Sequence, residues 1–112
     1  MAFRITPAHD PVVQIEFELP VKGRTDPLVF SVPKLHYFPL DVSAQYREWF
    51  QEQVTAKTAT DRACTLKLLE LLVPRHYKTL EKLTDGEIAQ ISKIWEQESR
   101  TNMGESSPSS DS

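Results

Sequence analysis

Hydrophobic and polar residues alternate over two short stretches in the first third of the chain. Apolar residues occupy every second position in residues 13–19 and 28–32, and the set is Val13, Ile15, Phe17, Leu19, Leu28, Phe30 and Val32. A period of two is typical of a strand with one buried face. Residues 20–27 contain Gly23, Asp26 and two prolines, which favour a turn. The pattern predicts an antiparallel β-hairpin over residues 12–32, with a loop too long for the tightest turn types.

From residue 41 onward the spacing of apolar residues changes to three and four, which is typical of amphipathic helices. We expect the first helix to be capped by Asp41 or Ser43 and to end near Lys57. Its apolar face consists of Tyr46, Trp49, Phe50 and Val54.

A second helix is predicted to begin at Asp61 and to carry a broad apolar surface, which implies contact with more than one neighbour. Pro74 ends this helix or opens a short third one over residues 75–82. The last helix is predicted to end near Arg100, and Thr84 and Glu87 have the spacing of a capping box at its start. Its expected buried face is made of Ile88, Ile91, Ile94 and Trp95.

These elements predict an α+β fold, in which an N-terminal antiparallel β-hairpin is followed by a bundle of three to four α-helices. A length of 112 residues supports one small domain, which we place at residues 12–100, with its helical body at 41–100. Residues 1–11 carry two prolines and no periodicity, and predict a flexible arm. Residues 101–112 are rich in serine and predict a disordered tail.

Charge and composition argue against membranes and nucleic acid as partners. The formal net charge is −3, and no run of residues is long and apolar enough to cross a membrane. Residues 1–4 lack the apolar run of a signal peptide, so we expect a cytosolic protein. Basic residues give the middle helices a mild positive bias, which neighbouring acids partly offset, so a small nucleic-acid-binding regulator is a weaker hypothesis.

Residue types that carry chemistry are scattered along the chain. Cys64 is the only cysteine, and His9, His36 and His76 fall in different predicted segments, so we expect no metal site. We expect Cys64 to be a buried small apolar residue and His76 to lie on the surface. Three glycines are too few for a phosphate-binding loop. The sequence therefore predicts no catalytic residue, no cofactor and no enzymatic activity.

Partner binding would need apolar side chains that face outward. The weak candidates are Leu68, Leu72, Ile91 and Trp95, which lie on broad apolar faces. The alternative is that all four are buried in the core. For Tyr46, Trp49 and Phe50 the sequence favours a core role, and a groove for a partner's amphipathic helix is the other interpretation.

The C-terminal part resembles the small tail assembly chaperones of long-tailed, siphovirus-type bacteriophages, especially those that infect actinobacteria. The segments that carry the resemblance are LLELLVP at 68–74, LTDGEIAQI at 83–91, IWEQES at 94–99 and GESSPSSDS at 104–112. The order of a hairpin and then a helical body is also similar.

The resemblance implies a non-enzymatic protein that binds the tape measure protein and helps tail tube protein polymerise around it. It further implies a longer, frameshifted form of the same protein, with the frameshift near residues 104–105, and a possible homo-oligomer. Such a protein would act in the cytoplasm of the infected bacterium and be absent from the mature virion. A structural tail or head-tail joining component is the alternative hypothesis.

Overall fold

The two alternating stretches form a two-stranded antiparallel sheet in the computed structural model, which describes residues 2–104. Strand β1 spans Gln14–Leu19 and strand β2 spans Leu28–Pro33, with Phe17 directly opposite Phe30. The apolar set faces the helices, while Glu16 and Glu18 lie on the exposed face. The predicted hairpin is therefore confirmed.

A β-turn lies inside the hairpin loop. The Arg24 amide donates to the Val21 carbonyl oxygen over 3.0 Å, and Gly23 at the third position of the turn has a φ of 88°. Residues with a Cβ rarely adopt this backbone conformation, which explains why glycine occupies the position.

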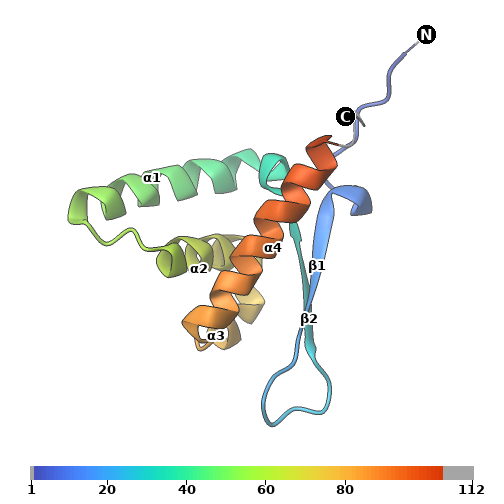
Figure 1. Cartoon of the computed structure of the whole chain (residues 1–112). Coiled ribbons are helices and arrows are strands. Elements are labelled where there is room, and N and C mark those ends of the chain that lie inside the picture. Colours follow the sequence, from blue (N-terminus) through green and yellow to red (C-terminus); the bar gives the residue numbers. More distant parts are fainter. Residues whose placement is uncertain (1, 105–112) are drawn as a thin grey trace.

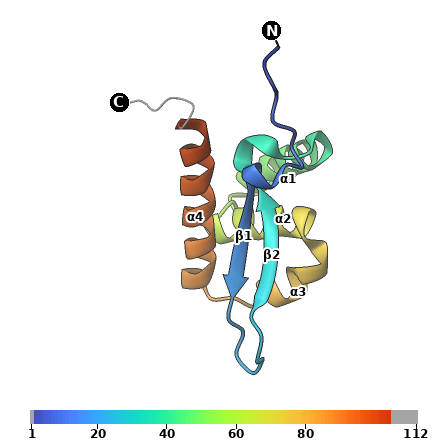
Figure 2. The ribbon, with the colours of Figure 1, turned by 90° about the vertical axis from the view of Figure 1, so that its right-hand side faces the viewer.

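Four α-helices follow the hairpin, and three short 3-10 turns lie before β1, between β2 and α1, and between α2 and α3. The α-helices are α1 (Leu40–Ala56), α2 (Asp61–Leu72), α3 (Tyr77–Leu80) and α4 (Asp85–Gly104), and the 3-10 turns are η1 (Pro11–Val13), η2 (Leu35–Tyr37) and η3 (Pro74–His76). Helices α2, α3 and α4 lie against the hairpin, and α1 runs outward from it (Figure 1). Figure 2 shows α4 beside β1, with the N-terminal arm pointing away from the body. The α+β fold expected from the sequence is confirmed.

The core lies between the inner face of the hairpin and helices α2, α3 and α4. Trp95 and Ile91 of α4 meet Leu69 of α2 and Leu80 of α3 there. The rings of Phe17 and Phe30 stack at a centroid distance of 5.3 Å. This burial of apolar surface is what stabilises a hairpin that would be marginal alone.

Two hydrogen bonds tie α4 to the segment that leaves β2. The indole Nε1 of Trp95 donates to the Pro33 carbonyl oxygen over 2.9 Å, and the Leu35 amide donates to the buried Ser99 Oγ over 2.9 Å. The Trp95 ring also packs on Phe38 at 5.8 Å between centroids. These contacts fix how α4 lies across the end of the sheet.

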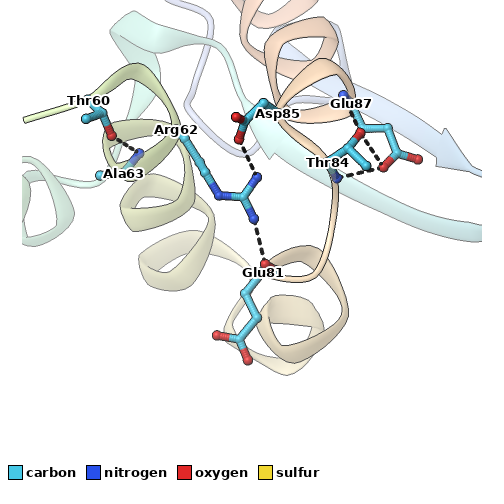
Figure 3. A network of polar contacts seen from close by, with 7 residues as sticks. All are labelled: Thr60, Arg62, Ala63, Glu81, Thr84, Asp85 and Glu87. Carbon is cyan, nitrogen blue, oxygen red and sulfur yellow. Dashed lines mark hydrogen bonds and ion pairs between the residues drawn. The ribbon is translucent and has the colours of Figure 1, made fainter.

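Polar contacts join α2 to the start of α4 (Figure 3). The Arg62 guanidinium donates to Asp85 Oδ1 over 3.0 Å and to the Glu81 carbonyl oxygen over 2.8 Å. The predicted capping box is confirmed, because the Thr84 amide donates to Glu87 Oε1 over 2.8 Å and the Glu87 amide donates to Thr84 Oγ1 over 3.3 Å.

Three local expectations were wrong. Helix α1 begins at Leu40 after Pro39, with no side-chain hydrogen bond at its cap, so neither Asp41 nor Ser43 is the cap. Helix α4 continues past Arg100 to Gly104, because no proline or glycine interrupts it earlier. Ile94 is 41% exposed and does not share the buried face of its neighbours on α4. Of the expected disordered tail at residues 101–112, residues 101–104 belong to α4, and residues 105–112 lie outside the described residues.

Candidate partner-binding surface

The α1 aromatic face consists of Tyr46, Trp49, Phe50 and Val54, which recur at the spacing that places them on one side of a helix. The Tyr46 ring lies 5.7 Å from the Trp49 ring and 6.0 Å from the Phe50 ring, measured between centroids. Neighbouring aromatic rings at these distances form one continuous apolar surface along the helix.

Half of the α1 aromatic face is covered by α2. Burial is the main cause that raises the pKa of the Tyr46 hydroxyl, and its hydrogen bond and charge interaction with Cys64 raise that pKa further. Lys67 Nζ lies 6.0 Å from the centroid of the Trp49 ring, within the range of a cation–π interaction. Cys64 is half-buried at this contact, which partly matches the small apolar role predicted for it.

The other half of the face is open to solvent. The exposed fractions are 36% for Phe50 and 49% for Val54, toward the end of α1 that leads into the connector to α2. Lys57, which ends α1, adopts a left-handed φ of 61°, and Thr60 caps α2 by accepting from the Ala63 amide over 3.0 Å. This tight connector keeps the two helices together while leaving Phe50 and Val54 uncovered.

A groove of about 330 Å³ lies where α1, α2 and α3 meet. We call it the α1–α2 groove, and its lining residues are Trp49, Thr60, Arg62, Ala63, Leu66, Lys67, Glu70 and Tyr77. Lys67 Nζ lies 3.4 Å from Glu70 Oε1, so the groove lining carries charges of both signs beside its apolar residues. Burial and the charges of Glu70 and Glu81 raise the pKa of the Tyr77 hydroxyl, against the opposing effect of Arg62.

The four candidates from the sequence lie inside the fold and around its core. Trp95 and Ile91 are buried core residues, and Leu68 and Leu72 are half-buried and pack against that core. Leu72 also lines a shallow cleft with Pro74 and His76. The α1–α2 groove contains none of the four.

The sequence favoured a core role for Tyr46, Trp49 and Phe50, because an aromatic face at helical spacing is usually part of a core, and a groove for a partner's helix was the alternative. A signal for the exposed half of α1 was nevertheless present in the sequence: several predicted elements have apolar faces, and each face needs another element to cover it. The hairpin is already covered by α2, α3 and α4, so α1 has α2 as its main neighbour and one helix cannot cover its whole face.

No group of three or more His, Cys, Asp or Glu residues in the described part of the chain could hold a metal ion. His76 is half-buried near Phe30, at 6.3 Å between ring centroids, and lines an open cleft, so it partly matches the expected surface position. None of the described helices is long and apolar enough to cross a membrane.

Comparison with other proteins found no matching family model, curated protein or solved structure.

Proposed function

We propose that this chain is a non-enzymatic tail assembly chaperone of a long-tailed bacteriophage. It binds the tape measure protein and promotes polymerisation of tail tube protein around it. The observation that carries the proposal is the open half of the α1 aromatic face, where Phe50 and Val54 remain exposed on a helix beside a groove lined by both apolar and charged residues.

An amphipathic helix of the partner suits this surface. Such helices bind by placing apolar residues, spaced three and four apart, in an apolar groove. Phe50 and Val54 supply an exposed apolar surface, and Trp49 and Leu66 supply apolar lining to the α1–α2 groove. Covering the partner's apolar stripe prevents that stripe from associating with other copies of itself.

A frameshift in the gene is a further part of the proposal, and the C-terminal sequence supports it. Residues 104–112 have the Gly-Glu and serine pattern of the family ending, so we place a frameshift near residues 104–105. This chain is then the shorter product of the gene, and the longer product is one of its partners. Both act in the cytoplasm of the infected bacterium and are absent from the mature virion.

Co-expression with the tape measure protein encoded by the same phage tests the binding step. We expect the two proteins to co-purify as a soluble complex. Replacing two apolar side chains at the open surface, in the double variant Phe50→Ser/Val54→Ser, should weaken binding at least about tenfold. Binding is measured by titration of the purified proteins, and circular dichroism checks that the variant remains folded.

Val29→Ser is the matched control, because Val29 is 47% exposed on β2, between the buried Leu28 and Phe30, and does not line the α1–α2 groove. It should bind as the unchanged protein does. Equal binding by the Phe50/Val54 double variant would reject α1 as the binding surface. Intact mass spectrometry of products expressed from the native DNA tests the frameshift, since a single product that ends at Ser112 would contradict it.

A further inference from the structure

The N-terminal arm carries the most exposed aromatic side chain of the described residues. Phe3 is 90% exposed and Ile5 is 82% exposed, with the exposed Arg4 between them. In an extended chain, alternate side chains point to opposite sides, so Phe3 and Ile5 share one side and Arg4 has the other. The arm thus has the side-chain pattern of a half-buried strand without any sheet beside it.

The outer edge of β1 offers backbone groups for such a strand. The Lys34 amide donates to the Val13 carbonyl oxygen over 2.8 Å, and the register pairs Phe17 with Phe30. Because bonded and non-bonded pairs alternate in an antiparallel ladder, the backbone N–H and C=O groups of Glu16 and Glu18 point to the outer edge. Within residues 2–104 they make no backbone hydrogen bond there.

A groove of about 270 Å³ runs beside this edge, between the second half of β1 and α4. Its lining includes the inward residues Phe17 and Leu19 as well as the outward Glu18, so it follows the strand edge. The α4 side is formed by Ile91 and the exposed Ile94, together with the polar Glu87 and Gln90. We call it the β1 edge groove.

We propose that the N-terminal arm of a second copy of this chain adds to the β1 edge as a third strand, and that two copies exchange their arms. Phe3 and Ile5 then lie in the β1 edge groove, and Arg4 lies on the outer face beside the acidic Glu16 and Glu18. Cross-strand pairs of opposite charge stabilise sheets, and adding a strand satisfies the free edge. Pro7 ends the added strand, because it has no amide hydrogen to donate.

The geometry favours a second copy over the chain's own arm. The arm leaves the body at the end of β1 where the strand begins, and it points away from the sheet (Figures 1 and 2). The β1 edge groove lies at the opposite end of β1, around residues 17–20. Exchange between two copies places each arm on the partner's groove and closes the assembly as a symmetric pair.

Light scattering of the full chain after size-exclusion chromatography tests the exchange. The mass should rise with concentration from 12.8 kDa for one copy toward twice that value. Phe3→Ser/Ile5→Ser should raise the dissociation constant at least about a hundredfold, because two apolar side chains lose their burial. Leu40→Ser, at an exposed leucine on α1, is the control and should leave the constant unchanged.

Charge reversal tests the pairing itself. Arg4→Glu alone and Glu16→Lys/Glu18→Lys alone should each weaken the dimer by about fivefold, and the three changes together should restore it. A mass that stays at 12.8 kDa up to about 1 mM, or a dimer unaffected by the arm variants, would overturn the proposal.

Copies that carry Ile5→Cys or Ile94→Cys, each with Cys64→Ser, are then mixed and oxidised. A disulfide-linked pair of the two different variants supports exchange. A disulfide that forms only when both cysteines are in one chain would show that each arm folds onto its own groove.

Discussion

Buried polar atoms show most clearly what single residues contribute to this fold. Trp95 was predicted to face the core, and it does, but its indole N–H also donates to the Pro33 carbonyl oxygen. Ser99 sits on the same helix, is 2% exposed, and accepts from the Leu35 amide. Neither bond was predictable, because each joins residues more than sixty positions apart in the sequence.

Replacing Ser99 by alanine should lower the free energy of unfolding by about 1–3 kcal/mol, since the part-buried Leu35 amide loses its acceptor. Urea unfolding followed by tryptophan fluorescence measures the change. Ser92→Ala is the matched control on the same helix, at a half-buried serine. It should shift the free energy of unfolding by less than about 0.5 kcal/mol. Equal shifts in the two variants would mean that the Ser99 hydrogen bond adds nothing to stability.

Helix ends were predictable where their signals are local. The capping box of α4 involves Thr84 and Glu87, three residues apart, so the sequence alone identified it. The start of α1 was missed because Pro39 enters the helix without a side-chain cap, and two polar residues just after it looked like better caps. The start of a helix can therefore be predicted from the sequence only when a side chain near that start forms the capping hydrogen bond.

The Glu87 carboxylate should stabilise α4 in a pH-dependent way. Hydrogen bonds from the Thr84 amide and hydroxyl hold its folded pKa below the ordinary value of 4.5. The charged form is thus favoured by folding, so the stabilisation is complete above pH 4.5 and is lost as pH falls through the lower folded pKa. Melting temperatures of the unchanged protein and of Glu87→Ala should differ at pH 7 and converge in acid. Glu96→Ala, at an exposed position on α4, should show no such convergence.

At the scale of the whole molecule, periodicity predicted the fold class but not the position of α1. A period of two gave the hairpin and a period near 3.6 gave the helices, because each reflects which side chains turn inward. Which element packs on a given apolar face depends on contacts between segments far apart in the sequence, and periodicity does not show these contacts. For Ile91 and Trp95 the sequence left open a core role and a partner-binding role, and both residues are buried in the core. For Phe50 the sequence favoured the core, yet the side chain is 36% exposed.

The uneven packing should appear in hydrogen exchange. Helix α1 has α2 as its main neighbour, and its buried apolar residue is Val42. Helix α4 buries the larger side chains of Ile88, Ile91 and Trp95. Elements with fewer buried contacts open at lower free energy, so the amides of residues 46–56 should exchange faster than those of residues 88–99. Mass spectrometry of peptides after timed exchange in deuterated water measures both segments in one sample.

Binding of the tape measure protein to the α1 aromatic face should slow exchange in α1 and leave the already protected α4 little changed. The Phe50→Ser/Val54→Ser variant serves as the control, because it retains α1 but should show no slowing when the partner is added. If α1 is as protected as α4 in the free protein, its exposed side chains do not reflect weaker packing. The open half of the face would then be a rigid surface, and binding would leave the exchange rates of α1 unchanged.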